Sequence, residues 1–450
     1  MQNDTLPTKK PGILINRNFA LLWCGQTISF MGDYFFDTTL VLWVATQVAG
    51  GQSWAPLAVG VVLAAASIPV LVIGPIAGVF ADRWEKRRTM LRMDAIRTVL
   101  IALLLPFATI IHLPALPTLV IISSVVFLAS ASAQFFSPSS LTLISTIVEE
   151  PQHARAFGLS QTTASLAMII APPLATVLFF AVGAKMALLF DSLSFAVSFL
   201  TILAIRAPRS VRSEVPGKQT SFLREFVEGI RFLGGNQILI TVLIAAFLVV
   251  LYEGCFSALG VFFLQQNLHT SLSFYGFLNT AMGLGLTVGA LLAAAFAQRL
   301  GVTRVLSIGL TLTGLLVIVY ARLTSFIPAL IIMFIQGLLV AGVNVAVNPL
   351  LLQTTPQALL GRVAAVAKTG LNLSSLLAVA IVSFLASTVM HDFHASILGV
   401  AFGPIDTIFM VAGLLATLGG LYAVFNLRAV KIAKVEEEVP IAYEDTLLVE

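Results

Sequence analysis

The chain has 450 residues, of which 58% are hydrophobic and 10% charged, and its mean hydropathy is +0.99. No soluble core could hide so much apolar surface, so the composition excludes a soluble enzyme or binding domain and indicates a polytopic membrane protein. The formal charge of +4 is spread along the chain in a topological pattern, which argues against a nucleic-acid partner.

Twelve apolar runs are long enough to cross a bilayer as helices, since a hydrocarbon core of about 30 Å requires about 20 residues. In chain order they are Phe19–Val48, Leu57–Phe80, Met90–Ile111, Leu116–Ile147, Ala156–Val182, Met186–Ile205, Ile238–Gln265, Phe274–Ala297, Val305–Leu323, Phe326–Leu352, Val363–Thr388 and Pro404–Asn426. The fourth run contains Pro138, which predicts a kink. We therefore predict an all-α membrane protein with two six-helix bundles.

Lys and Arg gather on one side of these spans, and only Lys185 and Arg322 fall on the other side. Because basic loops are retained in the cytoplasm during insertion, both termini are predicted to be cytoplasmic in a plasma-membrane protein. Residues 1–17 are polar and basic, and the apolar run that follows is too long for a cleavable signal peptide.

Three carboxylates are predicted deep inside the first and seventh spans. Counting ~1.5 Å per residue, Asp33 lies roughly 21 Å and Asp37 roughly 27 Å into the first span, and Glu253 lies roughly 22 Å into the seventh. A bare charge at such depth costs at least ~2.5–3.5 kcal/mol, so these groups normally have a role. They are candidates for a proton site or a site for a cationic substrate. Structural hydrogen bonding is the alternative.

The segment Gly78–Met90 is the most charged connection within the first half. After Asp82 at the end of the second span it contains a basic cluster, formed by Arg83, Lys86, Arg87 and Arg88. An aspartate there can accept hydrogen bonds from the first amides of a facing helix, and the cluster can hold acidic groups or lipid phosphates. We interpret it as a conformational latch, with a simple topology signal as the alternative.

Other polar side chains inside the spans are less specific. Asp94 and Arg97 have the spacing of an ion pair, and Asp191 is interpreted as structural. Four amides either line a cavity or join helices, namely Gln134, Gln161, Asn344 and Asn348. The histidines show no convincing ligand pairing, so no metal site is predicted.

The sequence divides into an N-terminal bundle over 1–206, a cytoplasmic linker over 207–236, a C-terminal bundle over 237–428 and a cytoplasmic tail over 429–450. In the linker, apolar residues recur at helical spacing, which predicts an amphipathic helix on the membrane surface: Phe222, Phe226, Ile230 and Leu233.

The two bundles read as repeats, because Ala-Asp82-Arg83 recurs as Ala-Gln298-Arg299 at an offset of 216 residues. The same offset relates Asp37 to Glu253. Repeated halves are typical of secondary transporters, whose substrate site lies between them.

The charged segment resembles the loop signature of the major facilitator superfamily, G-x-x-x-D-R-x-G-R-[KR], with Glu85 where many members have Gly. Further matches lie along the chain, namely Gly32-Asp33, Asp94-x-x-Arg97, Phe136-Ser-Pro138, Asp191-x-x-Ser-Phe195 and Gly361-Arg362-Val363. Together they are similar to the branch of macrolide-efflux and related drug:proton antiporters. The fifth-span motif G-x-x-x-G-P-x-x-G-G departs from that branch, since Ala167–Thr176 reads AMIIAPPLAT.

The resemblance implies a monomeric transporter that exports amphipathic drugs or similar small molecules in exchange for protons. It also implies that Asp82 faces the eleventh span, where Gly361 and Arg362 complete the latch. An importer, a siderophore exporter and a lysolipid flippase of the same fold are the alternatives. The sequence shows no catalytic cluster, no cofactor motif and no phosphate loop, and its two halves do not resemble the pore repeats of a channel.

Overall fold

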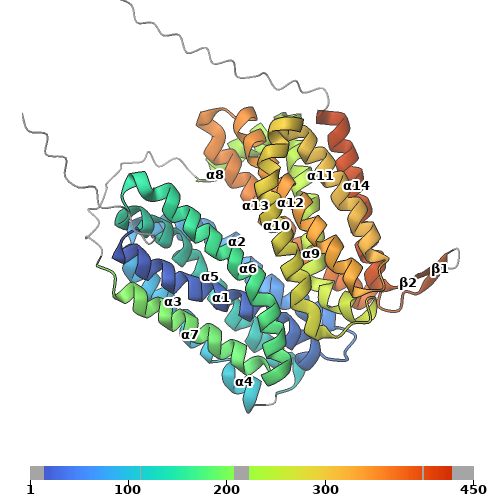
Figure 1. Cartoon of the computed structure of the whole chain (residues 1–450), viewed down its shortest axis with the longest axis horizontal. Helices are drawn as coiled ribbons and strands as arrows, with labels where there is room; N and C mark the ends of the chain where they lie inside the picture. Colours follow the sequence, from blue (N-terminus) through green and yellow to red (C-terminus); the bar gives the residue numbers. More distant parts are fainter. Residues whose placement is uncertain (1–14, 112, 207–221, 398–399, 428–450) are drawn as a thin grey trace, which may run out of the picture.

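The computed structural model describes residues 15–111, 113–206, 222–397 and 400–427 (Figure 1). The predicted tail over 429–450 and the first part of the linker, 207–221, lie outside these ranges. The N-terminal bundle contains α1 (Arg17–Trp43), α2 (Ala55–Arg83), α3 (Lys86–Ala102), α5 (Ala115–Ile147), α6 (His153–Val182) and α7 (Ala184–Leu203). The C-terminal bundle contains α9 (Gln237–Gln266), α10 (Tyr275–Leu300), α11 (Val302–Ala321), α12 (Phe326–Thr354), α13 (Gln357–Phe384) and α14 (Pro404–Leu427).

Shorter elements complete the fold. One-turn segments extend helix ends at η1 (Val44–Val48), η2 (Glu150–Gln152), η3 (Leu272–Phe274) and η4 (Leu385–Val389), and α8 (Phe222–Gly235) connects the halves. A hairpin of β1 (Ala395–Ile397) and β2 (Val400–Phe402) pairs Ala395 with Phe402. It is held by Arg322, whose guanidinium lies 2.7 Å from Asp406 and 4.9 Å from the Phe402 ring.

The predicted all-α, polytopic membrane fold is confirmed, although fewer of the described helices than the twelve predicted spans qualify as membrane-spanning by length and hydropathy. Ten helices in the described ranges are long and apolar enough to cross a membrane. The other two, α1 and α3, are more polar or shorter, and they pack inside the N-terminal bundle. The predicted third span, Met90–Ile111, began and ended too late, because α3 already starts at Lys86 and stops at Ala102 before a short α4 (Leu105–Thr109). Pro106 causes the break, since it lacks an N–H and its ring would clash with the carbonyl one turn earlier.

The same helix contacts recur in both halves. In the N-terminal bundle α1 packs against α6 and α7, α5 packs against α2 and α3, and α3 packs against α7. In the C-terminal bundle α9 packs against α13 and α14, α12 packs against α10 and α11, and α11 packs against α14. Each of these main packing pairs thus has its counterpart in the other bundle, as expected for a structural repeat.

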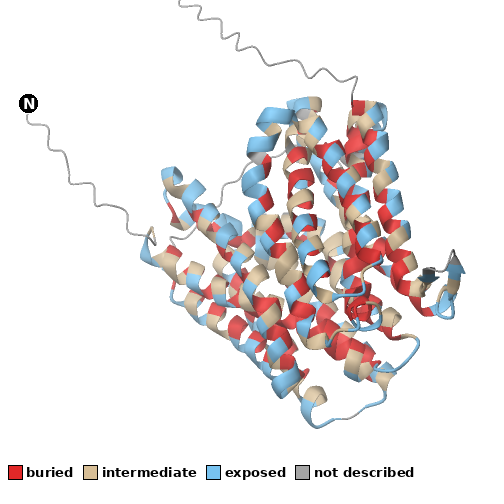
Figure 2. Cartoon of the chain, turned by 45° about the vertical axis from the view of Figure 1, so that its right-hand side comes forward, coloured by how far each residue is buried: buried red, intermediate tan, exposed pale blue. Residues whose placement is uncertain are grey.

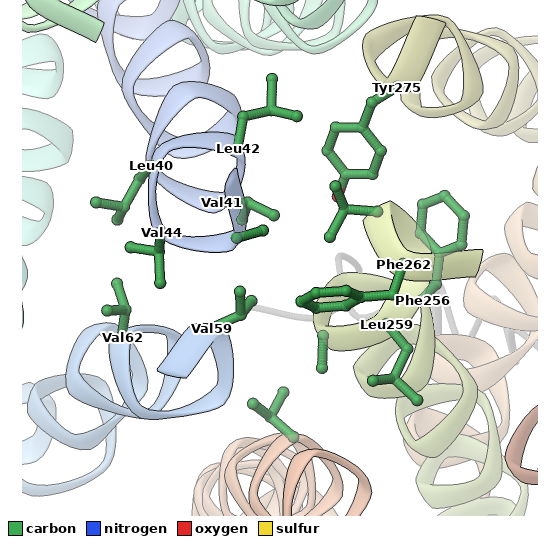
Figure 3. Packing of buried hydrophobic residues seen from close by; sticks show 14 of the residues in the cluster. Leu40, Val41, Leu42, Val44, Val59, Val62, Phe256, Leu259, Phe262 and Tyr275 are labelled. Atoms are coloured by element: carbon green, nitrogen blue, oxygen red, sulfur yellow. The ribbon is translucent and has the colours of Figure 1, made fainter. Parts of the chain in front are cut away.

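The two bundles meet at the end that carries the hairpin, through α2 against α13 and α6 against α10. The Leu57 N–H donates to Ser387 Oγ at 2.8 Å, and Thr280 Oγ1 donates to the Ile169 carbonyl at 2.7 Å. An apolar cluster fills this end with side chains from α1, α2, α9 and α10, including Val59 and Leu259 (Figure 3). The bundles diverge toward the other end, where α8 lies (Figure 1).

Buried residues concentrate between the helices of each bundle, and the outward faces are exposed (Figure 2). Many of these exposed side chains are large and apolar, such as Leu291 and Val120. In water such a surface would drive aggregation, whereas in a bilayer it contacts acyl chains.

Candidate functional site

A cavity of about 460 Å³ lies between the bundles, next to the closed end. Its walls come from α1, α2, α5 and α6 of one half and from α9, α10 and α13 of the other. Asp37 and Glu253, the two carboxylates related by the repeat, both line it. The structure therefore brings these two predicted residues into one cavity at the interface of the halves.

The remaining lining is apolar, aromatic and hydroxylic. It includes Tyr34, Ser67, Met168, Tyr252, Phe256, Ser257, Tyr275, Asn279, Met282 and Ser375. None of the described lining residues is Lys, Arg or His. A cavity with two carboxylates, aromatic rings and no basic group suits a ligand that is amphipathic and positively charged, because aromatic faces and carboxylates both attract cations.

Asp33 occupies a different environment, although it is one turn from Asp37 on α1. It is not among the cavity-lining residues, and it interacts electrostatically with Arg97 of α3. The next residue toward the helix start, Gly32, packs against α7 so closely that a Cβ there would lie 2.6 Å from an Asp191 carboxylate oxygen. Glycine is therefore required at this position for α1 and α7 to meet.

Arg97 is the centre of a buried polar network in the N-terminal bundle. Its guanidinium donates to Asp94 at 2.9 Å, which is the ion pair predicted from their spacing, and Ser198 Oγ donates to the other Asp94 oxygen at 2.6 Å. The guanidinium lies between two aromatic rings, 4.7 Å from the Phe136 centroid and 4.3 Å from that of Phe195. Both Asp94 and Arg97 are buried, so the pair is shielded from water.

Asp191 of α7 adds a further carboxylate to this network. It interacts electrostatically with Asp33, Asp37 and Arg97, and Ser194 Oγ donates to its carboxylate at 3.4 Å. Arg97 thus pairs with Asp94 and interacts electrostatically with Asp33 and Asp191, while Asp37 interacts with Asp33 and lines the cavity. Because the interior of a protein cannot hold this excess of negative charge, the arrangement is suited to binding protons.

The residues of the predicted latch lie at the diverging ends, where the printed partners of Arg87 and Arg88 belong to their own half and that of Arg362 belongs to α8. Arg87 donates to the Ile202 and Leu203 carbonyls of α7 at 3.1 and 2.6 Å, and Arg88 pairs with Glu85 at 2.8 Å. Arg83 is exposed, Lys86 begins α3, and Gly78 and Gly361 have open space around them. Arg362 pairs instead with Glu228 of α8 at 2.5 Å. The side chain of Asp82 lies outside the described residues.

The four candidate amides are not part of the cavity lining. Gln134 donates to the Ser130 carbonyl of its own helix at 3.2 Å, while Gln161 and Asn344 are exposed. The side chain of Asn348 lies outside the described residues. Sequence reasoning missed Tyr275, Asn279 and Ser375, because single polar residues in an apolar span carry no signal that assigns them to a shared cavity.

Comparisons with known proteins agree with a two-bundle membrane transporter fold. Residues 12–404 match the family model described as transmembrane secretion effector. The uncharacterized MFS-type transporter YkuC of Bacillus subtilis is 25% identical over 78% of this chain and 81% of its own length. Macrolide efflux protein A of Streptococcus pyogenes is 23% identical over 66% of this chain and 73% of its own. The crystal structure of nucleoside transporter NupG superposes with a TM-score of 0.69 at 12% identity, covering 92% of this chain and 99% of that one.

Proposed function

The chain belongs to the transmembrane secretion effector family of the major facilitator superfamily, and we propose that it exports amphipathic, cationic small molecules in exchange for protons. It is a multi-pass membrane transporter and not an enzyme. The observation that carries the proposal is the cavity between the halves, where each half contributes one carboxylate and no described lining residue is basic.

Competition at Asp37 and Glu253 supplies a coupling mechanism. A protonated carboxyl group is neutral and attracts a cation weakly, whereas the carboxylate attracts it strongly. Proton entry therefore releases the substrate, and proton loss prepares the cavity for the next one. Asp33 lies one turn away and connects the cavity to the charge network around Arg97, so a proton at Asp37 alters that network.

Closure of one end and divergence of the other support alternating access. We assign the diverging end to the cytoplasm on the positive-inside pattern, which makes this the inward-open state. In this proposal the latch residues Asp82 and Arg83 engage the start of α13 when the cytoplasmic end closes. Export from the plasma membrane by a monomer, with both termini and the linker in the cytoplasm, completes the proposal.

The relatives support the direction of transport. One is named a macrolide efflux protein, and its similarity extends over two thirds of this chain. Macrolides with an amino sugar are amphipathic cations, which is the chemistry that the cavity suits. They are therefore the first class to test.

The test uses inside-out membrane vesicles from cells that express the full chain. A panel of amphipathic cations, neutral analogues and anions is supplied, and uptake is followed after an imposed proton gradient. We expect concentrative uptake of cations that collapses with a protonophore and needs no ATP. Uptake that persists without a proton gradient, or that favours anions, would reject the proposal.

A further inference from the structure

A second binding site lies on the outer surface of the C-terminal bundle, away from the central cavity. An apolar groove of about 330 Å³ runs between α10, α11 and α12. Its walls include Leu292, Phe296, Leu300, Val305, Ile308 and Ile335. Three glycines, Gly289, Gly309 and Gly342, also line it, and at Gly342 a Cβ would meet only Val305, at 3.6 Å, so that side of the groove is open.

The groove has the length and polarity of a lipid tail. From Gly289 to Leu300 the helix rises ~16 Å, which is close to the ~15 Å depth of one leaflet. Phe296, Leu292 and Ile308 are all exposed along it. An apolar groove at this depth is accessible only to acyl chains, since water is absent there.

Two arginines flank the end of the groove at the membrane surface. Arg299 lies in the last turn of α10 and Arg304 in the first turn of α11, on either side of Gly301. Both side chains are exposed, and neither forms an ion pair with another described residue. No side chain caps the start of α11, so its first amides add to the positive potential at this turn.

The equivalent turn of the N-terminal bundle, between α2 and α3, differs because its arginine has an acidic partner. There Arg88, which the repeat relates to Arg304, is neutralised by Glu85 at 2.8 Å. The repeat places Gly301 where Glu85 stands, so the C-terminal turn has no acidic partner in sequence and remains available for an external anion. The apolar groove suits an acyl chain, and the two guanidinium groups at its end suit the phosphate group of the same lipid molecule.

We infer that this groove binds an anionic phospholipid, with one acyl chain between α10 and α11 and the phosphate at Arg299 and Arg304. The site is in the leaflet on the side where α1 begins. It depends neither on the substrate nor on the direction of transport. A bound lipid there would join the ends of α10 and α11, two helices of the C-terminal bundle.

The test compares phospholipid binding by native mass spectrometry of the purified full-length protein, using phosphatidylglycerol and phosphatidylcholine at equal concentration. Arg299→Gln and Arg304→Gln should each weaken phosphatidylglycerol binding about fivefold, and Arg92→Gln, an exposed arginine on α3, should not. Gly342→Leu should reduce binding by filling the groove, because a Cβ there meets only Val305, at 3.6 Å. Gly370→Leu, at an open position on α13, is its control.

Equal affinity for the two lipids, unchanged by the arginine variants, would mean a non-specific lipid shell and would overturn the inference. If Gly342→Leu does not fold, Phe296→Ala removes one wall of the groove and serves the same purpose. If Gly342→Leu, or Phe296→Ala in its place, folds and still binds phosphatidylglycerol as strongly as the unaltered protein, the inference would also be overturned. Because the readout is lipid binding, a failure of the proposed transport activity would leave this result unaffected.

Discussion

The two bundles have matching helix contacts and different interiors. On α3 of the N-terminal bundle, Asp94 and Arg97 form a buried ion pair. The repeat relates these positions to Leu310 and Thr313 on α11, which are also fully buried but carry no charge. The comparison teaches that small and apolar residues at helix contacts maintain the symmetric fold, while the charged chemistry can be confined to one half.

The central cavity is the exception to this asymmetry. There each half contributes one carboxylate, Asp37 or Glu253, at equivalent positions of the repeat. Apart from Asp406, which pairs with Arg322 next to the hairpin, the buried carboxylates of the described helices are thus of two kinds. In the N-terminal interior they are compensated by Arg97, and at the cavity they face a space that a proton or a cation can enter.

The largest change in the free energy of unfolding is expected from removing Arg97, the only described guanidinium of the buried network. Arg97→Leu leaves Asp94 buried without its partner, which typically destabilises a protein by about 3–5 kcal/mol. Thr313→Val, at the equivalent position of the other half, keeps the side-chain volume and removes a hydroxyl with no partner among the described groups, so it should change the free energy of unfolding by no more than about 1 kcal/mol. Chemical unfolding in detergent micelles measures both. Equal effects in the two halves would contradict the assigned difference between the interiors.

Neutralising the cavity carboxylates should abolish coupling while leaving the fold intact. For Asp37→Asn and Glu253→Gln we expect concentrative transport to fall about 100-fold, the loss of one charge–charge interaction of ~2.7 kcal/mol in a partly dehydrated site. Downhill exchange should persist. In the unaltered protein, cation binding should strengthen as pH rises, because deprotonation supplies the negative partner.

Vesicle transport and equilibrium binding across pH provide the measurement for these cavity variants. Asp392→Asn, in the exposed loop before the hairpin, is the control for loss of an acidic residue. Asp33→Asn is the third change, and it should act through Arg97 and not through direct contact with substrate. If all three variants keep proton-dependent concentrative transport and an unaltered pH profile, the carboxylate mechanism is wrong.

A smaller effect is expected at the latch. Asp82→Asn removes a charged acceptor for helix-end amides, an interaction of about 1 kcal/mol, so the population of the state closed at the cytoplasmic end should fall about fivefold. Gln298→Asn is the matched change in the other half, where the repeat has no carboxylate, and should leave the population unaltered. Distances between paired spin labels on the cytoplasmic ends of the two bundles measure the population of this closed state. The same distance distribution in both variants would exclude Asp82 from the latch.

The smallest effect is expected inside the C-terminal bundle. Gln336 is fully buried on α12, and its only described hydrogen bond runs to the Thr313 carbonyl at a long 3.5 Å. Its Oε1 has no partner among the described groups. Gln336→Leu should therefore change the free energy of unfolding by about 1 kcal/mol or less, in either direction. A loss comparable to that of Arg97→Leu would show that this interior also depends on polar contacts.

The sequence alone determined the class, most of the apolar spans and the repeat that relates the two halves. These follow from properties that are local or periodic, because a bilayer of fixed thickness demands apolar runs of fixed length and a repeat preserves motifs at a constant offset. The same reasoning located Asp37 and Glu253 as equivalent carboxylates, and Asp94 and Arg97 as a pair one turn apart. It placed the third span too late along the chain, and the error at its end came from giving Pro106 too little weight.

Only the tertiary structure decided which of these groups meet. Asp33 and Asp37 are four residues apart on α1, yet one interacts electrostatically with Arg97 and the other lines the cavity. The reason is that α1 packs against α7, which also packs against α3, while another part of its surface faces the opposite bundle. Asp191 joins the network through the close approach of α7 to Gly32, more than 150 residues away in sequence. The lipid-phosphate role inferred for Arg299 and Arg304 likewise depends on the apolar groove beside them, which the sequence does not reveal. Contacts between helices depend on side-chain shapes across distant segments, and no local pattern encodes them.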